Sequence, residues 1–84
     1  MSATEPRSES EIADWSVQFI SVLLEVPVAG IKRTVKFSRI GLDSAMLVYL
    51  LAGLEEWLAI EIDPDVAFEH PTIDQLARHL AAKQ

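Results

Sequence analysis

The chain has 84 residues, no cysteine and a formal net charge of −6, and half of its residues are hydrophobic. A chain of this length holds one small core, with no room for a catalytic domain beside a substrate domain, and the lack of cysteine excludes disulfides and thiolate metal sites. Because an acidic chain lacks the positive field that nucleic acids require, and no apolar run is long enough to cross a bilayer, we expect a cytoplasmic protein that binds neither nucleic acid nor membrane.

The charges are unevenly distributed along the chain. Residues 1–42 carry five acidic and five basic side chains, so the whole negative excess lies after Leu42. Four of those bases form a local cluster: Lys32, Arg33, Lys36 and Arg39. A solvated loop is the simpler explanation of this basic cluster, and a specific anion site is the alternative.

A first helix is expected from about Glu9 to Leu24. Ser8 and Glu11 have the spacing of a capping box, and residues 1–8 precede the helix as a flexible tail. Hydrophobic residues recur behind the cap at helical spacing: Ile12, Trp15, Phe19, Val22, Leu23 and Val26. Residues 27–41 then break the pattern, and we expect a long connection without regular structure, a feature that is often functional in a small domain.

A second helix is expected from Ser44 to Leu58, with Asp43 as its N-cap. One stripe of this helix can face a core: Leu47, Leu50, Leu51, Leu54 and Leu58. The opposite stripe is also largely apolar and suggests a docking surface: Ala45, Val48, Tyr49, Ala52 and Glu56. Ser44 lies in the first turn, where its hydroxyl points outward and an attached phosphate faces the unpaired amides of the helix start.

The last third of the chain predicts one short and one longer helix. Residues 58–62 alternate like a strand, but no second strand is available to pair with them, so we expect an extended linker. Asp63 and Pro64 predict a cap and first turn for a short helix over 65–68. Thr72 and Gln75 repeat the capping-box spacing before a final helix that ends at about Ala82, with residues 83–84 as a tail. The predicted fold is all-α, a small bundle of three main helices plus one short helix, in a single domain over residues 9–82.

The sequence shows no motif for autonomous catalysis. The only histidines are His70, in a turn before Pro71, and His79, which we expect to be exposed on the last helix. They do not share a helical face, and no zinc-protease, nucleophile-elbow or phosphate-loop motif occurs. We therefore expect a protein that is not an enzyme.

Three segments, residues 37–44, the helix after them and residues 68–80, resemble the acyl carrier proteins of polyketide and fatty-acid synthesis. Residues 37–44, FSRIGLDS, resemble the attachment motif of that family, and residues 68–77, FEHPTIDQLA, resemble its closing segment. The two motifs are correctly spaced, and the resemblance covers about residues 12–82.

The resemblance implies that Ser44, within the motif residues Leu42 and Asp43, receives a covalent 4′-phosphopantetheine arm from coenzyme A. The arm's thiol then carries acyl or polyketide intermediates as thioesters. The implied partners are a phosphopantetheinyl transferase, an acyltransferase or acyl ligase, and a ketosynthase or other synthase enzyme, acting on a monomer. A peptidyl carrier of a nonribosomal peptide pathway and an unmodified helical docking module are the alternatives.

Departures from the family pattern bear on partner choice. Ala45 replaces a common leucine, and no acid occurs between Asp43 and Glu55. We expect partners to dock chiefly by apolar contact, with Met46 and Tyr49 flanking the arm and with a weaker charge match from Glu55 and Glu56. The alternative is that Met46 and Tyr49 complete the core. Three further residues are candidates to open a groove for cargo: Leu47, Leu54 and Ile62. The basic cluster is a candidate to steer an acidic partner or, if Arg39 points toward Ser44, to contact the arm.

Overall fold

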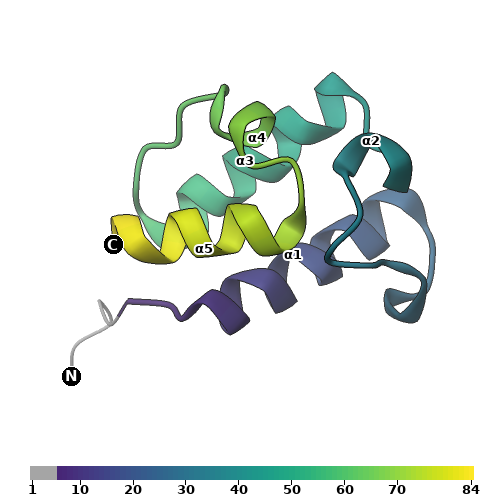
Figure 1. Ribbon diagram of the computed structural model, residues 1–84, viewed down its shortest axis with the longest axis horizontal. Coiled ribbons are helices and arrows are strands. Elements are labelled where there is room, and N and C mark those ends of the chain that lie inside the picture. Colours follow the sequence, from purple (N-terminus) through teal and green to yellow (C-terminus); the bar gives the residue numbers. More distant parts are fainter. Residues whose placement is uncertain (1–5) are drawn as a thin grey trace.

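The computed structural model describes residues 6–84 and shows a helical domain (Figure 1). Three long helices, α1, α3 and α5, surround the core, and shorter ones occupy the connections. The elements are α1 (Glu9–Leu24), the 3₁₀ helix η1 (Val28–Gly30), α2 (Phe37–Ile40), α3 (Ser44–Leu58), α4 (Val66–Glu69) and α5 (Ile73–Lys83). The described residues contain no strand, and none of their helices is long and apolar enough to span a membrane. The predicted all-α fold class is confirmed.

Side-chain caps define where the long helices begin. Ser8 Oγ accepts a hydrogen bond from the Glu11 amide at 3.1 Å, and Glu11 Oε1 accepts one from the Ser8 amide at 2.9 Å. The Asp43 side chain caps α3 by accepting from the Met46 amide, and Thr72 Oγ1 accepts from the Gln75 amide at 3.1 Å to cap α5. A cap of this kind stabilises a helix by about 0.5–2 kcal/mol because it pairs an amide that has no partner inside the helix. The predicted bounds of α1 and α3 are confirmed.

The connections contain more regular structure than the sequence predicts. The long connection over residues 27–41 was expected to lack regular structure, but it contains η1 and the four-residue α2. The short helix α4 begins at Val66, one residue later than predicted, because Asp63 caps the preceding turn by accepting from the Asp65 amide at 2.9 Å. Helix α5 continues through Lys83, and the Gln84 side chain exchanges two hydrogen bonds with the backbone of Arg7.

The long connection is attached to the turn between α4 and α5. The Phe37 amide donates to the Pro71 carbonyl at 2.9 Å, and Lys36 forms an isolated antiparallel bridge with Thr72. Nearby, the Asp74 amide donates to the Arg33 carbonyl at 3.1 Å. These bonds hold α2 beside the α4–α5 turn (Figure 1), although Phe37 and Pro71 are 34 residues apart in sequence.

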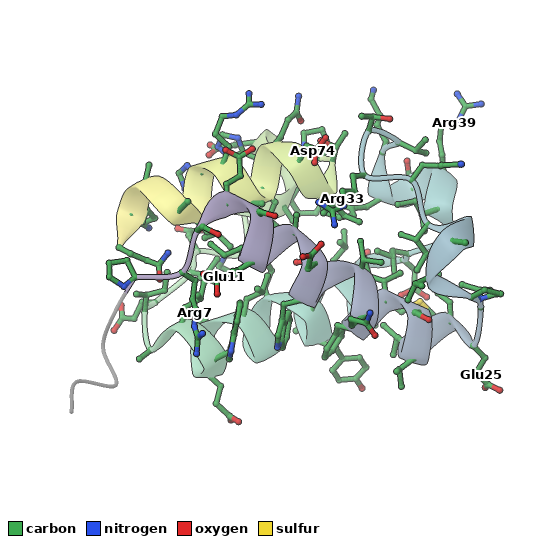
Figure 2. All side chains as sticks on the ribbon, turned by 90° about the horizontal axis from the view of Figure 1, so that it is seen from below. Arg7, Glu11, Glu25, Arg33, Arg39 and Asp74 are labelled. Carbon is green, nitrogen blue, oxygen red and sulfur yellow. The ribbon has the colours of Figure 1, made fainter. Side chains whose placement is uncertain are left out.

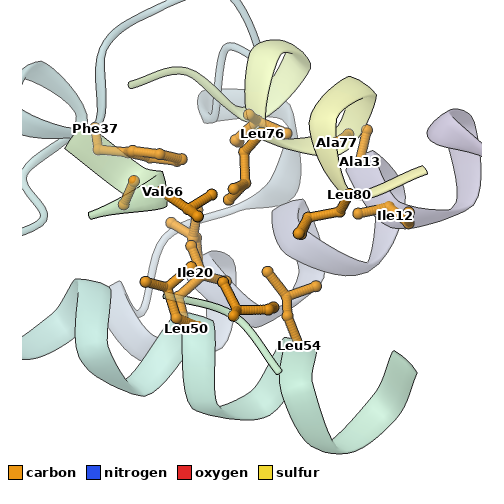
Figure 3. Packing of buried hydrophobic residues seen from close by; sticks show 14 of the residues in the cluster. Ile12, Ala13, Ile20, Phe37, Leu50, Leu54, Val66, Leu76, Ala77 and Leu80 are labelled. Carbon is orange, nitrogen blue, oxygen red and sulfur yellow. The ribbon is translucent and has the colours of Figure 1, made fainter. Parts of the chain in front are cut away.

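The core lies where α1 packs against α5 and α3 (Figure 3). Its fully buried side chains come from all three long helices: Ile12, Ile20, Leu50, Leu54, Ile73, Leu76 and Leu80. The hydrophobic residues that recur at helical spacing along α1 do not all face the core, because Val22 is 78% exposed. The missed inward residues of α1 are Ala13, Ser16, Val17 and Ile20. The buried face of α1 is therefore broader than one stripe, since the helix contacts two neighbours at once.

An aromatic stack joins α1 to α3 at the edge of the core. The Trp15 ring stacks on Phe19 and on Trp57, with 5.2 Å between ring centroids in both pairs. Gly53 makes room for this stack, because a Cβ atom there would lie 2.8 Å from the Trp15 ring. The Arg7 guanidinium lies 4.9 Å from the centroid of the Trp57 ring, a cation–π contact that covers the end of the stack.

Candidate functional site

Ser44 is the first residue of α3, and its side chain is exposed. The preceding turn delivers it there: Gly41 ends α2 in the left-handed region at φ 113°, and Leu42, only 4% exposed, anchors the turn in the core. Asp43 Oδ1 accepts from the Met46 amide at 2.9 Å. The Asp43 carboxylate therefore serves as the helix cap, and the Ser44 hydroxyl next to it faces solvent.

An apolar groove of about 330 Å³ lies beside Ser44. Its lining comes from α2, the first turn of α3, α4 and the turn after α4: Lys36, Phe37, Ser38, Leu42, Asp43, Ser44, Leu47, Ala67, Phe68 and Pro71. Phe68 is 68% exposed although it is aromatic, so it presents apolar surface at the groove instead of completing the core. The groove volume falls within the range of about 300–1,000 Å³ that is usual for small-molecule sites.

Of the residues predicted to open a cargo groove, the structure places only Leu47 beside Ser44. Leu54 is fully buried in the core, and Ile62 is 6% exposed and lines a separate hollow of about 110 Å³. Phe68 and Pro71 line the groove but were not predicted, because they arrive from a segment that is distant in sequence. The one feature of the sequence that could have indicated this contribution is the aromatic residue Phe68 within the second motif.

The predicted docking stripe of α3 faces solvent. All five members are exposed, with Val48 at 57% and Tyr49 at 61%: Ala45, Val48, Tyr49, Ala52 and Glu56. Met46 behaves differently, since it is half-buried and packs against the core. Met46 and Tyr49, which were predicted together to flank the arm, therefore point in different directions: Met46 toward the core and Tyr49 toward solvent.

Glu55 and Glu56 also have different surroundings. Glu55 is half-buried, and its Oε2 accepts from the Ile62 amide at 2.7 Å. This bond fixes the linker that follows α3, so Glu55 is engaged within the domain. Glu56 is exposed and faces solvent.

The basic cluster is dispersed in space. Arg33 pairs with Asp14 of α1, whereas Arg39 projects from α2 into solvent at one end of the molecule (Figure 2). Lys36, and not Arg39, lines the groove beside Ser44. Arg39 does not line the Ser44 groove, so the condition under which Arg39 would contact the arm is not met; the residue of the basic cluster that does line the groove is Lys36.

The two histidines lie against each other, and neither is part of the groove lining. Their rings stack with 4.3 Å between centroids, and His79 is half-buried instead of exposed as expected. Burial lowers the pKa of His79 below its ordinary value, the positive charges of His70 and Lys83 lower it further, and Glu69 opposes the shift. Neither histidine lines the Ser44 groove, and the described residues hold no cluster of three or more side chains able to bind a metal ion.

Comparisons with known proteins agree on one family. The model of the family described as "Phosphopantetheine attachment site" matches residues 17–80. Polyketide synthase PksL of Bacillus subtilis is 33% identical over 73 residues, which cover 87% of this chain and 2% of that protein. Acyl carrier protein TtuC of Teredinibacter turnerae is 31% identical over 80 residues, covering 94% of this chain and 92% of TtuC. The solution structure of Asl1650, an acyl carrier protein from Anabaena sp. PCC 7120, superposes with a TM-score of 0.86 at 32% identity, covering 99% of this chain and 94% of that one.

Proposed function

The chain belongs to the phosphopantetheine attachment-site family of carrier proteins, and from this premise we propose that Ser44 is the residue that receives the arm. Members of this family carry substrates and are not themselves catalytic, and we extend this to the present chain, which acts as the substrate-bearing partner of separate enzymes. The single observation that carries the proposal is the exposed Ser44 hydroxyl, which stands at a helix start and opens onto an apolar groove.

The residues around Ser44 fit a phosphate-linked arm. The amides of Ser44 and Ala45 have no partner inside α3, and a phosphate at a helix start is stabilised by about 0.3–1 kcal/mol. The Asp43 carboxylate opposes this gain, whereas the Lys36 ammonium in the groove lining favours a negative charge. The apolar walls formed by Leu47 and Phe68 suit the uncharged remainder of the arm.

Attachment forms one phosphodiester bond at this serine. Ser44 Oγ bonds to the phosphorus of the phosphopantetheine phosphate, the bond from that phosphorus to the nucleotide part of coenzyme A breaks, and adenosine 3′,5′-bisphosphate leaves. The hydroxyl proton passes to the transferase, because no described base lines the groove apart from the Asp43 carboxylate, which already caps α3. When bound, the arm supplies a thiol that carries acyl groups as thioesters, a group that this cysteine-free chain lacks.

The exposed stripe of α3 is the proposed docking face for the partner enzymes. Val48 and Tyr49 give it large apolar contacts, and no charged residue occurs between Asp43 and Glu55. Apolar surface of this kind favours association by shape and burial. The partners that fit the proposal are a phosphopantetheinyl transferase, an acyltransferase or acyl ligase, and a ketosynthase or other synthase enzyme, acting on a monomeric cytoplasmic domain over residues 9–82.

Among carrier types, the acyl carrier of a polyketide pathway has the better support. The similar proteins include a polyketide synthase and a discrete acyl carrier protein, according to their names. The chain spans 2% of the length of PksL and 92% of the length of TtuC, so both a module of a synthase and a separate carrier are represented. A structure titled as a free-standing peptidyl carrier protein from Acinetobacter baumannii shares the fold, with a TM-score of 0.85, but at 24% identity it supports the fold alone.

Intact-mass measurement tests the attachment residue. The protein is incubated with coenzyme A and a phosphopantetheinyl transferase of broad specificity, and we expect the wild type to gain the mass of one arm and Ser44→Ala to gain none. Ser38→Ala is the matched control, because Ser38 is an exposed serine in the same groove and its loss should leave loading intact. Loading of Ser44→Ala, or no loading of the wild type, would exclude Ser44 as the attachment residue.

A further inference from the structure

A second groove, of about 480 Å³, lies on the other side of α2 from Ser44. Its walls come from the α1–η1 connection, the last residue of η1, the loop after η1, and α2: Val26, Pro27, Gly30, Ile31, Lys32, Val35, Arg39 and Ile40. None of these residues lines the groove at Ser44. The carrier function proposed above does not use this groove.

The one-turn helix α2 is the wall between the two grooves. Phe37 and Ser38 line the Ser44 groove, whereas Arg39 and Ile40, the next two residues, line the second one. The bond from the Phe37 amide to Pro71 holds this wall in place at 2.9 Å. A partner seated in the second groove therefore contacts the side of α2 that faces away from the groove at the attachment serine.

The second groove combines an apolar lining with two cations. Val35 and Ile40 are half-buried, and Val26 is 39% exposed, so apolar surface is open to an occupant. Lys32 and Arg39 are exposed, and the ion pairs within residues 6–84 include neither of them. The sequence contains no acidic residue between Glu25 and Asp43, and Glu25 is not part of the lining.

We propose that this groove binds an acidic segment of a partner enzyme, in which carboxylates flank one or two apolar side chains. The apolar side chains fill the groove, and the carboxylates pair with Lys32 and Arg39. A long polyanion or an anionic membrane fits less well, because the net charge of −6 repels an extended negative surface while two local cations suit a short acidic segment. The identity of the occupant as a partner enzyme rests on the proposed carrier function; the binding chemistry does not.

The test is a titration of the ¹⁵N-labelled full chain with a synthetic peptide in which glutamate and aspartate alternate with leucine and phenylalanine. We expect amide shifts confined to residues 26–40, and none with a peptide that has lysine in place of the acids. Reversing both charges with Lys32→Glu and Arg39→Glu should weaken binding about tenfold, because two exposed charge pairs become repulsive. The milder Lys32→Gln and Arg39→Gln pair should weaken it less, and the spectra themselves report whether each variant is folded.

The matched control reverses two exposed bases elsewhere, Arg78→Glu and Lys83→Glu on α5, with the same change in net charge. Any of four results would overturn the proposal. The control could weaken binding equally, or the shifts could centre on residues 45–52. The lysine peptide could bind equally well, or the protein could bind phosphatidylglycerol vesicles in place of the peptide. Mass measurement of coenzyme A loading on the same samples separates the two hypotheses. Loading without peptide binding would reject the proposed role of the second groove and leave the attachment at Ser44 standing. Peptide binding without loading at Ser44 would reject the attachment residue and leave the second groove standing.

Discussion

His70 and His79 stack ring on ring, with 4.3 Å between centroids and 22° between planes, although one follows α4 and the other lies in the second turn of α5. The stack closes the turn that carries Pro71, the residue to which α2 is bonded. Two imidazoles at this distance tolerate one positive charge better than two, so the turn that supports the Ser44 groove contains a pH-sensitive contact.

Acidification should therefore weaken the fold through His79. The pKa of His79 in the folded protein lies below its ordinary value of 6.5, which the unfolded chain approximates, so the unfolded state binds the proton more readily. The stability of the neutral stack is complete above pH 6.5 and is lost as the pH falls below that value toward the lowered folded pKa. We expect the loss of Tm on acidification to be smaller in His79→Gln than in the wild type. An equal loss in both proteins would show that the stack does not couple folding to protonation.

Asp43→Ala should destabilise the domain by about 0.5–2 kcal/mol, because α3 loses its N-cap. Asp43→Asn keeps an oxygen that can accept from the Met46 amide and should cost much less. Urea unfolding measures both free energies. If the two variants lost the same stability, the charge of Asp43 and not its hydrogen bond would be the important property.

Gly41→Ala should cost roughly 1–2 kcal/mol, because φ at this position is 113° and an L-residue is strained there. Apart from Gly41 itself and its two neighbours in the chain, no residue comes within 4 Å of the position that the new Cβ would take, so the cost comes from the backbone conformation. Gly30→Ala is the control, since the space around it is also open and its φ is not positive. Equal unfolding free energies for the two variants in urea would contradict this account.

Tyr49→Ala should change stability by less than about 0.5 kcal/mol, since the side chain is 61% exposed, while Leu50→Ala in the core should cost about 2–5 kcal/mol. Met46→Ala should fall between them because Met46 is half-buried. Urea unfolding ranks the three variants, and the rate of arm loading reports on docking. A large stability loss in Tyr49→Ala with an unchanged loading rate would remove Tyr49 from the docking face.

The helices that local chemistry specifies were predicted well. Ser8, Asp43 and Thr72 each occupy a cap, and the long helices begin directly after them. Helix α2 was missed because four residues are too few to show a helical period, and it depends on the distant bond to Pro71.

Within the candidate site, local and distant contributions differ in the same way. The exposure of Ser44 and of the α3 stripe followed from the spacing of the leucines. The position of Phe68 in the groove and the contact between the histidines depend on how α4 packs against the other helices. No pattern along the sequence predicts that packing. The outward position of Val22 also depends on packing, because α1 turns its buried face toward two helices.

The paired hydrogen bonds between Arg7 and Gln84 fasten the two ends of the described chain to each other. They do so at one pole of the long axis, whereas α2 and the start of α3 occupy the other pole (Figure 1). A polypeptide fused before Arg7 or after Gln84 would therefore be attached at the end of the domain opposite Ser44. Such a fusion would leave the surface around Ser44 accessible to partner enzymes.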